Sequence, residues 1–250
     1  MGLRSTLDDL LWGNLRAEQP AEGFGPRVTV DTVLLGAYVK VRGGSRVLEL
    51  GCAHGILSLM LVKRALAAGR HIQVVGIDIQ RDLVDMALRN RDRHGLGDYA
   101  RFYSMDMRDV AGDWEEAPFD AVVVNPPYED PNRSRPSPRG PVALAVHGVM
   151  CSLEDVFRAA SRVLKPKGRF FMVMRAHRMA EALCGMRDFK LEPKRLTAVH
   201  PKPERAASVF LAEAVKCAKP GMVVESPLFI YGSHGEYTER LLKAYREEGL

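Results

Sequence analysis

The chain has few cysteines, and their positions argue against a disulfide framework or a zinc site. Among its 250 residues there are four cysteines, all far apart, and no pair has the short spacing of zinc ligands. Scattered thiols of this kind are typical of a reducing compartment. We therefore expect reduced cysteines, no bound metal and a cytoplasmic location. The residues concerned are Cys52, Cys151, Cys184 and Cys217.

Long apolar segments are lacking as well. No run reaches the length of a membrane span, the N-terminus has no signal-peptide pattern, and no internal repeat or shift in composition marks a second domain. An apolar content of 46% and a charged content of 27% are ordinary for a soluble globular protein. We expect one domain over residues 1–250, with 1–42 as an N-terminal extension and capping helix and 43–250 as the main sheet and C-terminal hairpin.

A large excess of charge of one sign is also absent. The net charge of +5 and pI near 9.1 favour a polyanionic partner only weakly. The positions of the cations in the sequence favour a polyanionic partner more than the net charge does. A segment rich in proline, serine and arginine at 131–141 is expected to be a surface loop, and a second basic stretch follows near residue 200. These cations suit phosphate groups, although a solvated loop is the alternative. They are Arg133, Arg135, Arg139, Lys202 and Arg205.

The most informative motif is Asn125-Pro126-Pro127-Tyr128. It follows Phe119–Val124, an apolar β-branched run that predicts a buried strand. Two successive prolines fix two φ angles and remove two N–H donors, so the chain can neither extend the strand nor begin a helix. The resulting corner presents an amide, backbone carbonyls and an aromatic ring, which together suit a flat substrate that carries an amine. A proline turn with a core tyrosine is the alternative.

A glycine turn upstream predicts a second binding site. A strand is expected at 45–50, then the turn Gly51-Cys52-Ala53-His54-Gly55, then a helix that opens with 56–62. A strand, a glycine turn and a helix bring backbone close to a ligand at the helix N-terminus. Glu49 precedes the turn, and its carboxylate suits a cationic amino-acid group and would repel a pyrophosphate. The turn therefore favours a cationic ligand over a dinucleotide.

The next two strands also end in carboxylates. The strand expected at 71–77 ends at Asp78, and the one at 101–105 ends at Asp106, with an amphipathic helix at 81–93 between them. An acidic residue after the second strand can accept hydrogen bonds from both ribose hydroxyls of a nucleoside. Each aspartate alone has a surface cap as its alternative, but acids after three successive strands predict one nucleoside site.

The rest of the chain continues the alternation of strands and helices. Helices are expected at 153–164, 177–186 and 237–247, with a turn at 165–168. Strands are expected at 169–174, 190–199 and 207–215, with an edge strand at 228–231. This alternation indicates an α/β fold.

Two of these motifs resemble those of known enzymes. Asn125–Tyr128 resembles the NPPY motif of amino methyltransferases, which act on an exocyclic nitrogen of adenine or guanine or on a glutamine amide. Residues 49–55 resemble motif I of class I S-adenosylmethionine methyltransferases, although Ala53 replaces its middle glycine. The resemblance implies a Rossmann-like fold: a seven-stranded, mostly parallel sheet with one antiparallel strand and helices on both faces.

Flanking segments resemble one family more narrowly, the bacterial tRNA adenine-N6 methyltransferases that act on position 37 of a valine tRNA. These segments are 15–20, 27–38, 195–202 and 235–238, so the resemblance spans nearly the whole chain. It implies methyl transfer from S-adenosylmethionine to an adenine amino group in tRNA. For 27–38 an N-capped amphipathic helix is also expected, with Asp31 as the cap and Val33, Leu34 and Ala37 facing the core.

The resemblance also implies roles for individual residues. Catalysis is expected at Asn125, Pro126 and Tyr128, where two oxygens accept the amine hydrogens and the ring stacks on the base. Substrate contacts are expected from Pro127, Tyr128 and the five cations named above. The cofactor-binding set is Thr29, Asp31, Glu49, Gly51, Cys52, Ala53, Gly55, Asp78, Ile79, Asp106, Met107 and Asn125.

Other functions remain open from the sequence. The same motif occurs in amino methyltransferases that act on glutamine in a release factor, guanine in ribosomal RNA or adenine in DNA. A non-catalytic module that only binds a nucleoside is a further alternative, but the joint presence of Glu49, Asp78, Asp106 and Asn125 argues against it.

Overall fold

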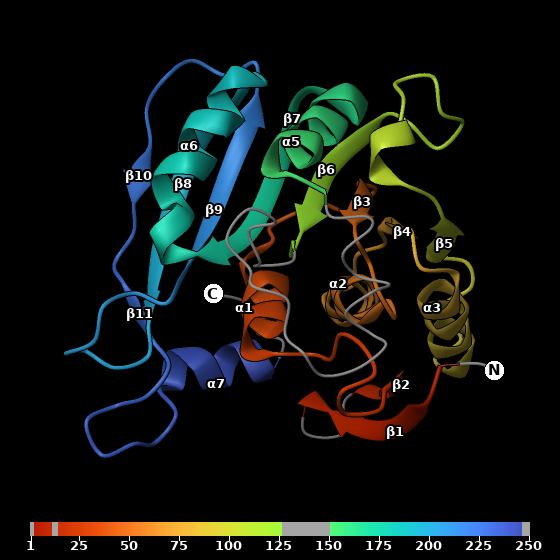
Figure 1. The fold of residues 1–250 in the computed structure, drawn as a ribbon, viewed down its shortest axis with the longest axis horizontal. Helices are drawn as coiled ribbons and strands as arrows, with labels where there is room; N and C mark the ends of the chain where they lie inside the picture. Colours follow the sequence, from red (N-terminus) through yellow and green to blue (C-terminus); the bar gives the residue numbers. More distant parts are fainter. Residues whose placement is uncertain (1–2, 12–14, 127–150, 247–250) are drawn as a thin grey trace.

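A computed structural model describes residues 3–11, 15–126 and 151–246. Strands and helices alternate along most of the chain, as predicted (Figure 1). The strands are β1 (Ser5–Leu10), β2 (Leu15–Pro20), β3 (Arg46–Leu50), β4 (Gln73–Asp78), β5 (Ala100–Ser104), β6 (Phe119–Val124), β7 (Leu164–Arg175), β8 (Leu191–His200), β9 (Val209–Lys216), β10 (Val223–Val224) and β11 (Leu228–Phe229). The helices are α1 (Val30–Tyr38), α2 (Ile56–Ala67), α3 (Arg81–Arg93), η2 (Met107–Asp109), α5 (Leu153–Val163), η3 (Ala176–Arg178), α6 (Met179–Asp188) and α7 (Glu239–Tyr245).

The main sheet has the order β10-β8-β9-β7-β6-β3-β4-β5, and β11 also pairs with β8. Over the residues that the structure describes, the sheet has nine strands, two more than predicted. Its seven long strands, β3 to β9, are the predicted ones, and β10 and β11 add two residues each, parallel to β8. β9 is antiparallel to both β7 and β8, as predicted for the single antiparallel strand. The order reverses at β3, because β4 lies on one side of it and β6 on the other. Doubly wound sheets bind their ligands at the carboxyl ends of the strands next to such a reversal.

Helices cover both faces of this sheet. Neighbouring residues of a strand point to opposite faces, so Val47 of β3 belongs to the core cluster that includes residues of α1, α2, α3 and α7, whereas Leu48 belongs to the cluster that includes residues of α5 and α6. The central strands are buried on both sides, which explains why their sequences are continuous apolar runs rather than alternating ones.

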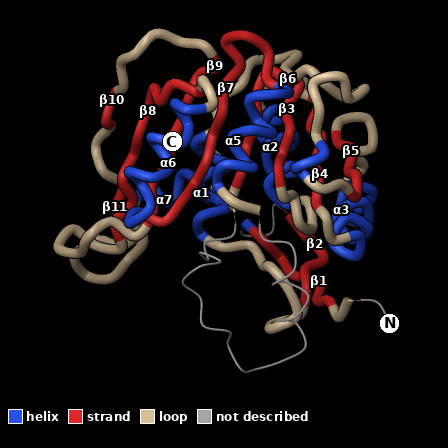
Figure 2. The backbone as a smooth tube through the Cα atoms, turned by 45° about the horizontal axis from the view of Figure 1, so that its top comes forward, coloured by secondary structure: helices blue, strands red, loops and turns tan. Residues whose placement is uncertain are grey.

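The N-terminal extension contains a β-hairpin that the sequence analysis did not predict. β1 and β2 pair antiparallel from Ser5↔Pro20 to Leu10↔Leu15, and the hairpin lies apart from the main sheet (Figure 2). It docks on α3 through Asn90, whose Oδ1 accepts from the Glu18 N–H at 2.7 Å and whose Nδ2 donates to the Glu18 carbonyl at 2.9 Å. The sequence of β1 is mostly polar because the strand is largely exposed, and this hides the usual strand pattern.

The cap of α1 differs from the prediction. Val33, Leu34 and Ala37 are buried as expected, but the helix begins at Val30 and Thr29 occupies the N-cap position. The Thr29 side chain makes no capping hydrogen bond, and Asp31 lies in the first turn, so the predicted Asp31 cap is wrong. An acidic side chain in the first turn still interacts favourably with the helix dipole.

β7 begins earlier than predicted. The expected turn at 165–168 lies inside the strand, where pairing with β6 shifts between Phe119↔Leu164 and Ala121↔Arg169. Lys167 has a positive φ of 63° at this irregularity. The residues that predict a turn therefore do distort the backbone, but they form a bulge within the strand instead of ending it.

Candidate active site

A cavity of 780 Å³ lies at the carboxyl ends of the central strands. Its walls come from the glycine turn after β3, the segments after β4 and β5, the end of β6 and the segment before α1. Ten residues of the predicted site line it: Glu49, Gly51, Cys52, Ala53, Asp78, Ile79, Asp106, Met107, Asn125 and Pro126.

The glycine turn passes close to its neighbours. The Gly51 and Cys52 N–H groups both donate to the Ile77 carbonyl at 2.9 Å, which fixes the turn against the end of β4. Gly55 has a φ of 83°, and a Cβ there would lie 2.8 Å from the Ala87 Cβ. Ala53 also has a positive φ, 46°. Left-handed backbone costs an alanine roughly 1 kcal/mol, which accounts for the glycine that motif I usually has at this position.

Glu49 is buried at the end of β3, where the Ser58 hydroxyl donates to its carboxylate. Burial raises the pKa of Glu49 to about 8, and the nearby Asp78 carboxylate adds to the rise. The free protein therefore holds Glu49 mostly protonated at neutral pH. A cation bound beside it would favour the ionised form.

We expect the ligand-free protein to lose stability as the pH rises above 6.5. The pKa of Glu49 is raised from 4.5 to about 8, so between these values the folded protein holds a proton that the unfolded chain has lost. The free energy of unfolding then falls with pH, by at most about 1.4 kcal/mol per pH unit. Burial lowers the pKa of His54 from 6.5 to about 4 and also lowers the pKa of His94, which gives an opposite slope that fades as the pH rises through 6.5. At higher pH the effect of Glu49 dominates.

Urea unfolding of the ligand-free protein at a series of pH values measures this slope. The matched variant is Glu49→Gln, which keeps the shape of the side chain but cannot ionise. Its stability should be nearly flat where that of the wild type falls. An equal fall in both proteins would show that another group is responsible.

Asp78 joins the glycine turn to the segment after β4. Its Oδ2 accepts from the Ala53 N–H and its Oδ1 from the Gln80 N–H, both at 2.9 Å. Burial raises the pKa of Asp78, although these two hydrogen bonds oppose the rise. Each carboxylate oxygen has a second lone pair, so a fixed carboxylate of this kind can still accept two further hydrogen bonds.

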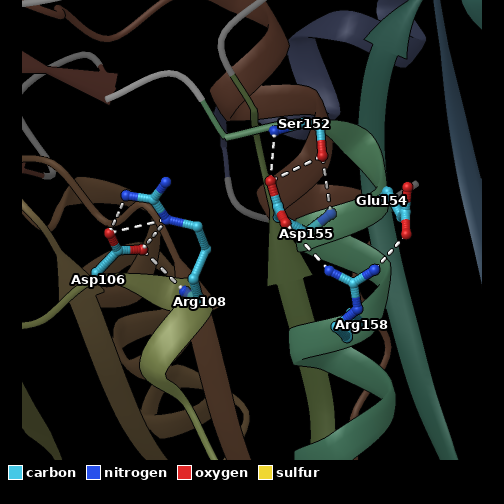
Figure 3. Close-up of polar contacts among 6 residues, drawn as sticks. All are labelled: Asp106, Arg108, Ser152, Glu154, Asp155 and Arg158. Carbon is cyan, nitrogen blue, oxygen red and sulfur yellow. Dashed lines mark hydrogen bonds and ion pairs between the residues drawn. The ribbon is translucent and has the colours of Figure 1, made fainter. Parts of the chain in front are cut away.

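Asp106 lies against Arg108 (Figure 3). Its Oδ1 accepts from the Arg108 N–H at 2.9 Å and from Arg108 Nε at 3.0 Å, and the second carboxylate oxygen also contacts the guanidinium. These hydrogen bonds hold the pKa of Asp106 below its usual value. Any ligand that uses this carboxylate must share it with Arg108 or displace the guanidinium.

The start of α5 is fixed by a capping box (Figure 3). The Asp155 N–H donates to the Ser152 Oγ at 3.1 Å, and the Ser152 N–H donates to the Asp155 carboxylate at 3.0 Å. Cys151, the residue before this cap, lines the cavity.

Asn125 lies at the cavity wall where β6 ends. Its Nδ2 donates to the Thr32 hydroxyl of α1 at 3.3 Å, a long hydrogen bond that orients the amide. Thr32 also lines the cavity and was not among the predicted residues, although its neighbour Asp31 was.

Several predicted residues lie elsewhere. Thr29, Asp31 and Gly55 do not line the cavity, and Gly55 instead forms the left-handed start of α2. Lys202 and Arg205 lie in the loop between β8 and β9, where the Arg205 N–H donates to the Lys202 carbonyl. That loop is at the same edge of the sheet as the cavity, because β8 runs parallel to β7. Outside the described residues are Pro127, Tyr128, Arg133, Arg135 and Arg139.

The cavity also contains polar residues that the sequence analysis missed. His54 is buried in the glycine turn, and neither of its ring nitrogens has a hydrogen-bond partner. Arg27 lines the same cavity, and its guanidinium donates to Asp8 at 2.8 Å, which ties the hairpin to the site. Arg175, at the end of β7, completes this group. The position of His54 within the glycine turn was the one available signal.

The described part of the chain contains no cluster of three or more potential ligands from His, Cys, Asp and Glu that could hold a metal ion. Within the same residues, no helix is long and apolar enough to span a membrane.

Comparisons with known proteins agree with this geometry. A family model described as a methyltransferase domain matches residues 42–206. Three bacterial proteins named tRNA1(Val) (adenine(37)-N6)-methyltransferase are similar over most of their length. The one from Phocaeicola vulgatus is 25% identical over 82% of this chain and 85% of its own. The one from Aeromonas salmonicida is 27% identical over 87% of each chain, and the one from Parabacteroides distasonis is 29% identical over 78% and 79%.

Solved structures show the same fold. A predicted O-methyltransferase from Agrobacterium tumefaciens superposes with a TM-score of 0.69 at 18% identity, covering 88% of this chain and 97% of its own. A putative class I S-adenosylmethionine-dependent methyltransferase from Listeria monocytogenes gives a TM-score of 0.57 at 14% identity, over 78% and 62%. At these identities the likeness concerns the fold alone.

Proposed function

Because this chain belongs to the family of methyltransferase domains, we propose that it methylates the exocyclic amino group of adenine in tRNA, at position 37 of a valine tRNA. The observation that carries the proposal is the presence of Asn125 and Pro126 on the wall of a cavity that Glu49 and Asp78 also line. The tRNA substrate is the one named for the three similar bacterial proteins. It also supports the cytoplasmic location expected from the sequence.

The polar side chains in the cavity suit the chemical groups of S-adenosylmethionine. The buried Glu49 carboxylate suits the ammonium of an amino acid, and Asp78 has lone pairs for two ribose hydroxyls. The His54 ring is buried without a partner, and such a group costs about 1–3 kcal/mol unless a ligand satisfies it. The carboxylate in the methionine part of S-adenosylmethionine can accept a hydrogen bond from this ring. When bound, S-adenosylmethionine supplies an electrophilic methyl group.

The residues after β6 would prepare the amine. In adenine, the lone pair of the amino nitrogen is delocalised into the ring. The Asn125 side-chain oxygen and the Pro126 carbonyl would accept the two amine hydrogens, which favours a pyramidal nitrogen whose lone pair points at the methyl group. Tyr128 is proposed to stack on the base, an interaction worth about 1–3 kcal/mol. Position and orientation supply most of the acceleration in such a site. No strong base would be required before transfer, because the amine proton becomes acidic once the nitrogen is cationic; that proton and S-adenosylhomocysteine would then be released.

The basic loops would hold the RNA around the target base. Lys202 and Arg205 lie at the edge of the sheet where the cavity opens, and Arg133, Arg135 and Arg139 follow the proline corner in the sequence. Cations at these places suit backbone phosphates. A base in an anticodon loop is already partly unstacked, so moving it into a pocket costs less than from a duplex.

Incubation with unmodified tRNA and methyl-labelled S-adenosylmethionine tests the function. We expect label in N6-methyladenosine after complete digestion, and nuclease mapping should place it at position 37 of a valine tRNA. Parallel reactions contain ribosomal RNA, DNA and a release factor. Label in guanine or in protein, with none in tRNA, would contradict the proposal.

A further inference from the structure

A second cavity, of 500 Å³, lies at the opposite edge of the sheet, where β3, β6 and β7 begin. β3 has five residues, so a rise of about 3.3 Å per residue separates the two edges by roughly 17 Å. This cavity shares no lining residue with the first. The charged residues in its wall are Lys40, Arg42, Asp120, Lys165, Lys167 and Arg169.

The one carboxylate in this wall is already used. Asp120 Oδ1 accepts from Lys165 Nζ at 2.7 Å, and Oδ2 accepts from the Arg46 N–H at 2.8 Å. These contacts keep the pKa of Asp120 low, although burial opposes them, so the group stays ionised and paired. Asp120 therefore balances Lys165 and none of the other four cations of the wall.

Arg169 also has a carboxylate partner. It pairs with Glu213 at 2.9 Å, and Arg195, which shares Glu213 at 3.1 Å, has a second partner in Glu225 at 3.6 Å. Lys167 donates one proton to the Cys217 carbonyl at 2.7 Å, which leaves its charge uncompensated. Among the described residues, no carboxylate forms an ion pair with Lys40 or Arg42, and both are exposed.

Three of the cations in this wall come from the bulged part of β7. Pro166 and the positive φ of Lys167 turn the backbone, so that Lys165, Lys167 and Arg169 all line the cavity. In a regular strand, residues 165, 167 and 169 would share one face of the sheet and pack against the helices there. The bulge instead allows lysines at positions that a buried strand would not tolerate.

We propose that this cavity binds phosphate groups, and that the backbone of the RNA substrate supplies them. Five cations line this concave site, and three of them, Lys40, Arg42 and Lys167, have no carboxylate partner in the part of the chain that the structure describes, so a polyanion relieves their mutual repulsion. The choice of RNA as the source rests on the proposed function. An RNA whose target base lies in the first cavity reaches the second only if it extends at least roughly 17 Å from that base, a distance set by the length of β3. A complete tRNA has this reach, whereas a trinucleotide centred on the target base does not, because phosphates follow one another at about 3.4 Å along the axis of a strand.

The double variant Lys40→Gln/Arg42→Gln tests the proposal, with binding measured by fluorescence anisotropy over a range of salt concentrations. We expect its affinity for a full-length tRNA transcript to fall about threefold to tenfold at low salt, and the slope of log affinity against log salt to decrease by about 1 to 2. Affinity for a trinucleotide centred on adenosine, which is too short to reach the second cavity, should not change.

The matched control is Arg187→Gln/Arg246→Gln. It removes the same number of charges, but from guanidiniums outside the cavity that are paired with Glu192 and Glu239. Its affinity for the transcript should remain near that of the wild type. Equal affinities and salt slopes for the Lys40/Arg42 variant and this control would overturn the RNA assignment.

Inorganic tripolyphosphate separates the two possible sources of phosphate. If it raises the melting temperature of the wild type but not of the Lys40/Arg42 variant, while both bind the transcript equally, the phosphate site stands and its ligand is a free polyphosphate. If neither ligand distinguishes the variant from the control, the proposal is wrong. These binding measurements use no cofactor, so a failure to methylate tRNA would overturn the proposed function separately.

Discussion

Replacing Asn125 with alanine should reduce turnover by about a hundredfold to a thousandfold while leaving affinity for S-adenosylmethionine nearly unchanged. That magnitude is typical for the loss of one hydrogen-bonding group that acts mainly in the transition state. In the structure the Asn125 amide lies on the cavity wall and is oriented by Thr32, so the variant removes the proposed acceptor for one amine hydrogen. Single-turnover methylation of tRNA gives the rate, and calorimetry gives the affinity for the cofactor.

Thr32→Val is the matched control for this result. It removes the 3.3 Å hydrogen bond to the Asn125 amide but keeps the amide itself, so turnover should fall only several-fold. Near wild-type turnover in Asn125→Ala would eliminate the proposed mechanism. A large loss of cofactor affinity in that variant would instead assign Asn125 to cofactor binding.

Replacing Asp78 with alanine should weaken S-adenosylmethionine binding by about a hundredfold or more. Two hydrogen bonds from hydroxyls to a carboxylate contribute about 1.5–3 kcal/mol each. The same substitution removes the acceptor for the Ala53 and Gln80 N–H groups, so the glycine turn loses part of its support. Isothermal titration calorimetry gives the affinity, and thermal unfolding of the ligand-free protein reports how much of the change is structural.

Asp106→Ala provides the comparison, because it removes a second carboxylate from the same cavity. Arg108 already occupies both oxygens of Asp106, so a ligand gains less from this carboxylate and the loss of affinity should be smaller. Equal losses in the two variants would show that Asp78 has no special role in binding the nucleoside.

The sequence predicted the central architecture because its signals were local. The buried strands β3, β4 and β6 are apolar runs, and the polar groups at their ends follow directly in the chain. Parallel strands bring those ends together, so Glu49, Asp78 and Asn125 reach one cavity without any long-range information. The antiparallel β9 was expected from the resemblance, and its strand pattern was visible in the sequence.

The parts that sequence analysis missed depend on tertiary contacts. The hairpin of β1 and β2 is held by a buried asparagine on α3 more than seventy positions away, which no local pattern reveals. Asp31 was predicted as the cap because aspartate is a preferred N-cap residue, but the helix begins one residue before it, at Val30. His54 and Arg27 gave no signal by residue type, because their significance comes from burial and from a shared cavity.

The side-chain amide of Asn90 on α3 connects the N-terminal β-hairpin to the glycine turn of the first cavity. Asn90 Nδ2 donates both to the Glu18 carbonyl of β2 and to the His54 carbonyl in the glycine turn, the latter at 3.0 Å. The hairpin of β1 and β2 therefore supports the wall of the ligand pocket, even though it lies outside the main sheet. A truncation that starts at β3 would retain motif I and the NPPY motif, yet the wall of that pocket would lose the support that the hairpin gives it through Asn90.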